Sequence, residues 1–225
     1  MTDLRGWVVR READTRELTC DLEDFGVDLL DPLTEPAQGE DHLGDVAVDV
    51  HYSSINYKDA MSLHGTPGIA RRFPLIAGLD IVGEVVESRH PRFSPGDVVA
   101  IGGSTHGETQ HGGLATRAHA RGDELTALPE VFTERQAAGI GTAGVTAAIA
   151  ALHLADHGVR PGDGPIVVTG AGGGVGSFAI ALLAGAGYEV VAATGRPDEL
   201  GDRMRELGAA DVIGRDELTS IDRPL

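Results

Sequence analysis

The segment PIVVTGAGGGVG at residues 165–176, followed directly by SFAIALLAGAG, decides the fold of this chain. An apolar, β-branched run at 166–169 meets a cluster of glycines, and small and apolar side chains then recur at helical spacing. The pattern predicts a strand, a tight turn and a helix. Its glycines let the backbone turn sharply and approach a ligand, and the first amides of the helix point over the turn.

Such a turn suits a pyrophosphate, so we interpret it as a cofactor-binding loop. Its residues are Gly170, Ala171, Gly172, Gly173, Gly174, Val175 and Gly176. The spacing is G-x-x-G-x-x-G rather than G-x-G-x-x-G, and the loop alone leaves a plain structural turn open as the alternative. Because residue 176 is glycine rather than lysine, the phosphate loop of nucleoside triphosphatases is excluded.

Composition limits the partners of this chain. The formal net charge of −17 over 225 residues argues against nucleic acid or an anionic membrane as a partner, because both would repel it. Lys58 is the only lysine, which is typical either of an acidic salt-adapted surface or of a genome that favours arginine. The single cysteine, Cys20, permits no internal disulfide, and we find no run of roughly 18 apolar residues. We therefore expect a soluble, cytoplasmic protein.

Short strands separated by Gly and Pro follow one another in the first half of the chain. A strand is expected at 4–10, polar turns at 11–45, a half-buried strand at 46–52, a short helix from Asn56 to Gly65, and further strands within 74–86, 93–100 and 114–128. This pattern indicates a small β-rich, barrel-like domain. We expect the glycine-rich segment 102–113 to form a mobile loop. Its His106 and His111 are expected to be solvated, and we assign them no role.

The second half of the chain changes to helical patterns. A helix opens at Thr133 with Gln136 in a capping-box position, and helical spacing continues toward Gly158. After the glycine loop come a strand at 188–194, a helix at 197–207 and a strand at 210–213. This β-α-β-α-β order is half of a doubly wound nucleotide-binding fold with a parallel sheet.

Six motifs, in order, resemble the medium-chain dehydrogenase/reductase superfamily. They are NYKDA at 56–60, FPLIAGLDIVGEV at 73–85, FSPGDVV at 93–99, GGLAT at 112–116, GTAGVTA at 141–147 and IVVTGAGGGVGSFA at 166–179. More narrowly they resemble its quinone-oxidoreductase branch, in the subgroup of acryloyl-CoA reductases and quinone oxidoreductases. The resemblance implies a GroES-like catalytic domain at 1–128 and a partial Rossmann NADP-binding domain at 129–225, with cofactor and substrate in the cleft between them.

The chain departs from this family in two respects. Zinc-dependent relatives carry G-H-E-x-x-G where this chain has Gly78-Leu79-Asp80-Ile81-Val82-Gly83, so an imidazole ligand is missing and we expect no metal. Family members are also longer, with a second half of the Rossmann sheet and a dimer-forming edge strand. We therefore keep a truncated, inactive nucleotide-binding fragment as an alternative, with an open apolar edge at the third strand or its neighbour and a doubtful homodimer.

The end of the second predicted strand indicates the cofactor. NAD-binding proteins place an acidic residue there for the ribose 2′-hydroxyl, whereas this chain has Thr194, Gly195 and Arg196. A hydroxyl and a guanidinium can bind a 2′-phosphate, so we predict NADPH, with a solvated Arg196 as the alternative. The resemblance also places Thr142 near the nicotinamide, although GTAG at 141–144 is equally an ordinary helix start.

Without a metal, hydride transfer needs an acceptor that is already polarised, such as an enoyl thioester or a quinone. The resemblance places Asn56, Tyr57, Lys58 and Asp59 at the mouth of the cleft, where Tyr57 or Lys58 could donate a proton. Helix caps and a core tyrosine are the alternative. Arg71 and Arg72 could meet the phosphates of coenzyme A. The sequence thus predicts an NADPH-dependent reductase of an acryloyl-CoA-like substrate, with quinone reduction as the alternative activity.

Overall fold

The computed structural model describes residues 4–33 and 44–219. The chain forms two compact units, Met1–Thr142 and Ala143–Leu225. The division falls inside α2 (Glu134–Asp156), next to Gly141, whose φ of 43° and ψ of −156° interrupt the helix. The sequence predicts the change of domain earlier in the chain, between residues 128 and 129.

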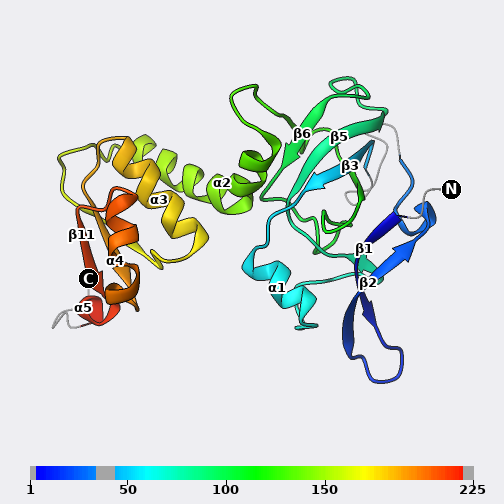
Figure 1. The fold of residues 1–225 in the computed structure, drawn as a ribbon, viewed down its shortest axis with the longest axis horizontal. Helices are drawn as coiled ribbons and strands as arrows, with labels where there is room; N and C mark the ends of the chain where they lie inside the picture. The colour runs from blue at the N-terminus through cyan, green and yellow to red at the C-terminus, as the bar shows by residue number, and fades with distance from the viewer. Residues whose placement is uncertain (1–3, 34–43, 220–225) are drawn as a thin grey trace. The chain divides into compact units, whose positions relative to one another are not determined.

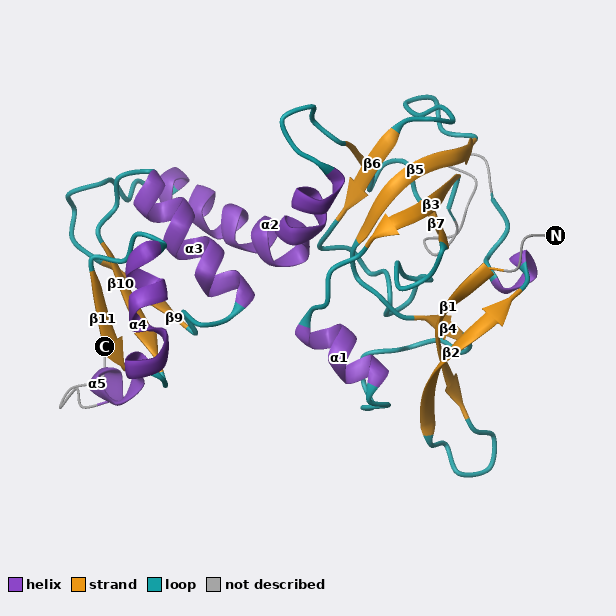
Figure 2. Cartoon of the chain, viewed as in Figure 1, coloured by secondary structure: helices purple, strands orange, loops and turns teal. Residues whose placement is uncertain are grey.

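The first unit is built from two antiparallel sheets (Figures 1 and 2). One has the order β2-β1-β4 and the other the order β7-β3-β5-β6-β8. Their strands are β1 (Leu4–Arg11), β2 (Leu18–Phe25), β3 (Val46–Tyr52), β4 (Leu75–Ile76), β5 (Ile81–Ser88), β6 (Val98–Ile101), β7 (Arg117–Ala120) and β8 (Thr126–Ala127). The larger sheet buries a core that includes Val46, Val48, Ile81, Val85 and Val99. The β-rich first domain expected from the sequence is therefore confirmed.

β2 and the short 3-10 helix η1 (Val27–Leu29) lie in a segment for which only turns were expected, so that expectation is wrong. β2 pairs with β1 along its whole length, and the Glu23 carboxylate accepts hydrogen bonds from the Arg10 guanidinium at 2.8 and 3.0 Å. Its acidic side chains conceal the strand pattern in the sequence. Burial, together with Asp21 and Glu23, raises the pKa of the Cys20 thiol to about 11, so this thiol stays protonated near neutral pH.

The loop at 102–113 is packed into the first unit, and its histidines are buried rather than solvated. The amides of Gly112 and Gly113 donate to the carbonyls of Ile76 and Gly78, at 2.9 and 3.1 Å. His106 is fully buried and His111 is 4 % exposed. The expectation of solvated histidines is therefore wrong, because the glycines permit close backbone packing that composition does not reveal.

The second unit contains the predicted β-α-β-α-β order, which confirms the Rossmann-type fold class. Its strands β9 (Ile166–Thr169), β10 (Val190–Thr194) and β11 (Asp211–Gly214) are parallel in the order β11-β10-β9. The helices are α3 (Gly174–Gly185), α4 (Pro197–Glu206) and α5 (Arg215–Thr219). α3 contacts β9 and β10, whereas α4 contacts β10 and β11 (Figure 2).

The sheet order agrees with the first of the two expected positions of the open edge, because the third strand, β11, lies at an edge of the described sheet. β10 lies in the middle, so the neighbour of the third strand is not an edge, whereas β9 and β11 are the edges of the described sheet. Val167 on β9 is 45 % exposed, which places apolar surface at that edge. The last residues of the predicted second domain, 220–225, lie outside the described residues.

α2 is long and apolar enough to cross a membrane by length and composition alone, with a mean hydropathy of 1.5 over 18 residues. The sequence predicts no such segment, so by this criterion that prediction is wrong. One such helix is weak evidence for a membrane span, and 22 % of its apolar window is buried. Ala147 is fully buried, and Ala151 and Leu154 pack against the core of the second unit.

Candidate functional site

The glycine loop between β9 and α3 has the backbone geometry of a ligand-binding turn. Gly170 has a φ of 61°, in the left-handed region that favours glycine. A Cβ on Gly176 would lie 2.5 Å from the Gly170 carbonyl oxygen and 2.8 Å from the Ala171 Cα, so glycine here lets α3 begin close against the end of β9. The turn therefore presents backbone, rather than side chains, to a ligand.

A pocket of about 540 Å³ in the second unit lies over this turn. It is lined by Thr169, Gly170, Gly172, Gly173, Ala193, Thr194, Gly195, Arg196, Leu200, Arg215 and Leu218. The lining side chains include two arginines and no carboxylate, although the chain as a whole carries a net charge of −17. A cationic pocket on a glycine turn fits a phosphate-rich nucleotide.

The predicted selectivity residues lie together at the end of β10. Thr194 is buried, and its hydroxyl oxygen accepts a hydrogen bond from the Arg196 amide at 3.3 Å. The Arg196 guanidinium pairs with Glu199 at 3.1 Å, and both side chains are 62 % exposed. Exposed pairs at this spacing are worth only about 0.3–0.5 kcal/mol, so a bound phosphate could compete for Arg196.

The predicted catalytic residues lie at the start of α1 (Tyr57–Leu63) in the first unit. Asn56 is the N-cap of this helix. The Asp59 carboxylate accepts hydrogen bonds from the backbone amide of Asn56 at 2.7 Å and from the backbone amide of Leu79 at 3.0 Å. Burial raises the pKa of the Asp59 carboxyl, whose side chain is fully buried. Because this carboxylate accepts a hydrogen bond from the N-cap backbone, it helps to cap the helix. Tyr57 is 81 % exposed and is therefore the member of this group most open to a ligand.

Lys58 is held by the buried Glu108 from the loop at 102–113. The Lys58 Nζ lies 2.5 Å from Glu108 Oε1, and Arg71 Nη2 lies 3.5 Å from Glu108 Oε2. The side chains of Lys58 and Arg71 are 50 % and 65 % exposed, so each cation remains accessible while paired. The sole lysine and Arg71 thus share one carboxylate.

Arg72 is more firmly engaged than Arg71. Its guanidinium forms a two-pronged pair with Asp31, with N–O distances of 2.7 and 2.9 Å. Two-pronged arginine–carboxylate pairs are among the stronger polar contacts in proteins. A substrate phosphate would have to displace Asp31 to bind Arg72, so of the two arginines Arg71 is better placed to meet a ligand.

Asp80 is a site residue that the sequence analysis did not identify. It is fully buried; its Oδ1 accepts from the Thr142 amide at 3.0 Å and the Thr142 hydroxyl at 2.6 Å, and its Oδ2 accepts from Asn56 Nδ2 at 2.8 Å and from the Ser54 hydroxyl. The predicted residues Asn56 and Thr142 are thus positioned by one carboxylate. A charged residue within the apolar segment 73–85 was the available signal.

Gly141 permits this arrangement. A Cβ at 141 would lie 2.6 Å from Asp80 Oδ2 and 2.8 Å from the Ser54 hydroxyl oxygen, and the φ of 43° is itself unfavourable for other residues. The Thr142 hydroxyl also accepts from the Gly103 amide at 2.8 Å, so both of its hydrogen-bonding roles are filled. We therefore interpret Thr142 in the first place as a residue that holds Asp80 and the Gly103 backbone in position within the first unit.

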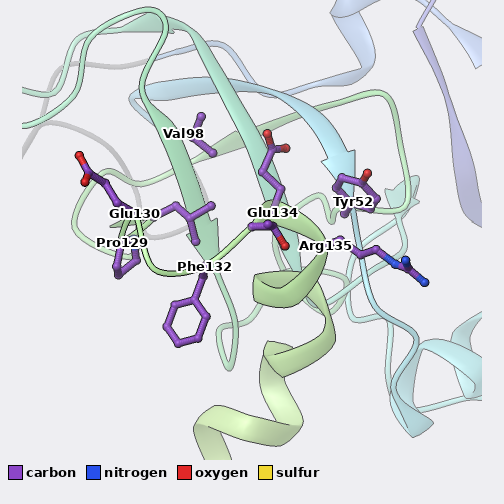
Figure 3. A pocket seen from close by; sticks show the side chains of 9 residues that line it. Tyr52, Val98, Pro129, Glu130, Phe132, Glu134 and Arg135 are labelled. Carbon is purple, nitrogen blue, oxygen red and sulfur yellow. The ribbon is translucent and has the colours of Figure 1, made fainter.

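No group of three His, Cys, Asp or Glu side chains in the described ranges 4–33 and 44–219 is placed to hold a metal ion. Leu79, where zinc-dependent relatives have an imidazole, is 3 % exposed in the core. Another pocket, of about 460 Å³, lies in the first unit at the start of α2, beside Tyr52, Phe132 and Glu134 (Figure 3). None of the residues predicted for catalysis, substrate or cofactor binding lines it.

Residues 42–161 match the alcohol dehydrogenase GroES-like domain. The chain belongs to this family. Within the medium-chain dehydrogenase/reductase superfamily, its similarities place it in the zinc-free branch that contains acrylyl-CoA reductases and quinone oxidoreductases. The predicted family is therefore confirmed.

Two relatives illustrate the similarity. The acrylyl-CoA reductase AcuI of Ruegeria pomeroyi is 47 % identical over 184 residues, 81 % of this chain and 56 % of the relative. The Bacillus subtilis protein YhfP, which carries a quinone oxidoreductase name, is 42 % identical over 173 residues, 77 % of this chain and 52 % of the relative. The chain thus spans about half the length of these relatives.

Solved structures agree with the fold. The yhdH oxidoreductase from Salmonella enterica, in complex with NADP, has a TM-score of 0.87 at 42 % identity, over 98 % of this chain and 64 % of that one. The Bacillus subtilis yhfP structure, with NAD bound, has a TM-score of 0.85 at 35 % identity, over 96 % of this chain and 62 % of that one. Relatives of this fold therefore take either dinucleotide.

Proposed function

We propose that this chain carries the cofactor site and the catalytic domain of an NADPH-dependent reductase. Its substrate would be an α,β-unsaturated acyl-CoA such as acryloyl-CoA, reduced at the C=C bond. The pocket over the glycine loop carries this proposal, because its backbone turn and two arginines suit a phosphorylated dinucleotide. The sequence similarity of this chain to the acrylyl-CoA reductase AcuI of Ruegeria pomeroyi supports this substrate class.

The choice of NADPH rests on this chain's own residues. The strand ends that line the pocket carry Thr194 and Arg196 and no carboxylate, whereas an acidic residue would be needed for a ribose 2′-hydroxyl and would repel a 2′-phosphate. The Salmonella relative with NADP supports this choice, and the Bacillus relative with NAD makes it worth testing. We propose the glycine loop at 170–176, Gly195 and Thr142 as further cofactor-site residues.

When bound, NADPH would supply the hydride, and the residues of α1 and its cap would serve the substrate. Asn56 Nδ2 donates to Asp80 at 2.8 Å and to Asp59 at 3.2 Å, so it would have to release one of these acceptors to donate to the enolate oxygen that develops as the C=C bond is reduced. Tyr57, which is largely exposed, and Lys58 are the candidate proton donors, whereas Asp59 holds the start of the helix. Arg71, assisted by Arg72, would meet the phosphates of coenzyme A.

Three further features complete the proposal. The domain limits are 1–128 and 129–225, the localisation is cytoplasmic, and nucleic acid and membranes are not partners, because the net charge of −17 would repel both.

A quinone is the alternative substrate, supported by the quinone oxidoreductase name of YhfP. Steady-state assays with acryloyl-CoA, crotonyl-CoA and a benzoquinone would separate the two activities. Calorimetric titration of NADPH and NADH into the 225-residue chain tests the cofactor site: tight binding of NADPH would support it, and binding of neither dinucleotide would count against it.

Arg196→Asp is expected to weaken NADPH binding at least about tenfold, because a charge-assisted contact to the 2′-phosphate is replaced by repulsion. Binding of NADH should change far less, because NADH has a hydroxyl at that position. The measurement is the ratio of the two dissociation constants in the wild type and the variant. A ratio that stays unchanged would refute the role of Arg196.

A further inference from the structure

We propose that His153 and His157, at the carboxyl end of α2, form a surface binding site for a divalent metal ion such as Zn²⁺. The site belongs to the second unit, because α2 passes into that unit after Thr142. It is distinct from the proposed dinucleotide pocket, whose lining includes neither histidine. It is also distinct from the position of Leu79, where zinc-dependent relatives carry an imidazole.

The spacing of the two histidines places both imidazoles on one face of the helix. The His157 amide donates to the His153 carbonyl at 3.0 Å, so helical geometry extends to residue 157, and residues four apart on a helix are neighbours on its surface. The stretch HLADH at 153–157 has the histidine spacing of the helical zinc motif H-E-x-x-H. Leu154 stands where that motif has its catalytic glutamate, so the spacing supports metal binding and not hydrolysis.

The two rings lie close enough to share one ion. Their centroids are 6.1 Å apart, and their planes are tilted by 49°. Because Zn–N bonds are about 2.0–2.1 Å long, an ion between the rings can reach one nitrogen of each. Both histidines are exposed, so the ion can enter from solvent without any opening of the fold.

A hydrogen bond prepares His157 as a ligand. Its Nδ1 lies 2.8 Å from the His153 carbonyl oxygen. A carbonyl oxygen only accepts, so Nδ1 carries the proton in this contact and the neutral ring has its lone pair on Nε2. Histidines that bind metals commonly use this arrangement, in which one ring nitrogen donates to the backbone and the other binds the ion.

The surroundings of the pair favour a cation. The last carbonyls of a helix carry partial negative charge, and the exposed Asp156 lies between the two histidines in the chain. The net charge of −17 also attracts cations to this surface. Arg160 follows closely in the chain, but its guanidinium donates to the carbonyls of Ala155 at 2.5 Å and Val159 at 3.3 Å and is thus engaged with the backbone.

The donor set selects the class of metal. Imidazole nitrogens suit Zn²⁺, Ni²⁺ and Cu²⁺, whereas Mg²⁺ prefers oxygen ligands. In the described ranges no third His, Cys, Asp or Glu side chain joins the pair, so water would complete the coordination of the ion. We therefore expect weaker binding than at structural zinc sites with four protein ligands. Because both ligands come from one turn, a bound ion would hold that turn in helical geometry.

The test titrates ZnCl₂ into the 225-residue chain and follows the histidine ring resonances by NMR. The resonances of His153 and His157 should shift together, whereas MgCl₂ at the same concentrations should shift neither. His153→Gln and His157→Gln are each expected to weaken zinc binding at least about tenfold. His64→Gln, which removes an exposed histidine of the first unit, is the matched control and should leave the affinity for zinc unchanged.

Amide hydrogen exchange supplies a second readout. If zinc holds the end of α2, exchange of the His157 amide should slow about tenfold at a free zinc concentration of about ten times the dissociation constant. Neither glutamine variant should show this slowing. Far-UV circular dichroism checks that each variant keeps its helices.

Three results would overturn the proposed site. The first is the absence of a shift in the two rings at zinc concentrations up to about 1 mM. The second is a loss of affinity in only one of the two glutamine variants, or in neither, because the rings would then not share an ion. The third is equal binding of magnesium, which would assign the contact to carboxylates rather than to imidazoles.

Discussion

Asp80→Ala is expected to lower the free energy of unfolding of the first unit by about 3–5 kcal/mol. The carboxylate is fully buried and accepts hydrogen bonds from Asn56 Nδ2, the Ser54 hydroxyl, the Thr142 amide and the Thr142 hydroxyl. Its removal leaves these donors without their acceptor in a site where water has little access. Each unsatisfied buried donor costs roughly 1–3 kcal/mol, and the total is less than the sum because the site relaxes.

Urea unfolding followed by Trp7 fluorescence measures this loss, because the only tryptophan lies on β1 of the same unit. Asp49→Ala is the matched control, since Asp49 pairs with Arg117 while its side chain stays 43 % exposed. Exposed pairs contribute at most about 1 kcal/mol. A loss at Asp80 no larger than the loss at Asp49 would show that the network does not stabilise the unit.

The parts of the fold that the sequence predicts are those with a strong local signal. The α1 start was found because Asn56 and Asp59 form a cap at fixed spacing, and the β-α-β-α-β order because β-branched runs alternate with helical spacing around glycines. β2 was missed because its acidic side chains conceal the pattern that pairing with β1 stabilises. Its strand character comes from a partner, not from its own composition.

The candidate site could also be predicted only where the local sequence carries a signal. Asn56, Thr142 and the glycine loop follow from local motifs, but their common contacts do not. Asp80 brings Asn56 and Thr142 together through a buried network that joins residues 24 and 62 positions apart in the chain. Arg215 reaches Gly195 because two parallel strands share a register. Both relationships depend on long-range pairing, which is set by the folded sheet rather than by neighbouring residues.

The buried His106 is expected to make the first unit less stable as the pH falls from 6.5 toward 4. Burial lowers the pKa of His106 from 6.5 to about 4, so the imidazole stays neutral in the fold over this range while the unfolded chain takes up a proton. The unfolded state then binds more protons than the folded one, and stability rises with pH across the window. The loss between about pH 7.5 and about pH 4.5 amounts to roughly 2–3 kcal/mol from this group.

The structure explains why protonation is unfavourable. His106 Nδ1 lies 2.6 Å from the Ser104 hydroxyl oxygen, which also accepts a hydrogen bond from the His106 backbone amide at 3.2 Å. Burial is the main cause, because a charged imidazolium in this fully buried position would lose its hydration. The buried Asp59 acts in the opposite direction, because its raised pKa adds stability as the pH falls, so the net effect of acid must be assigned by substitution.

His106→Gln removes the titrating group and should reduce the dependence of the urea midpoint on pH in this window, even if the variant is less stable at neutral pH. His64→Gln is the matched control, since His64 is exposed just after α1 and its replacement should leave the wild-type dependence intact. The comparison uses the change in unfolding free energy between the two pH values for each variant. If His106→Gln and the wild type lost the same free energy on acidification, His106 would not be the group that links the fold of the first unit to pH.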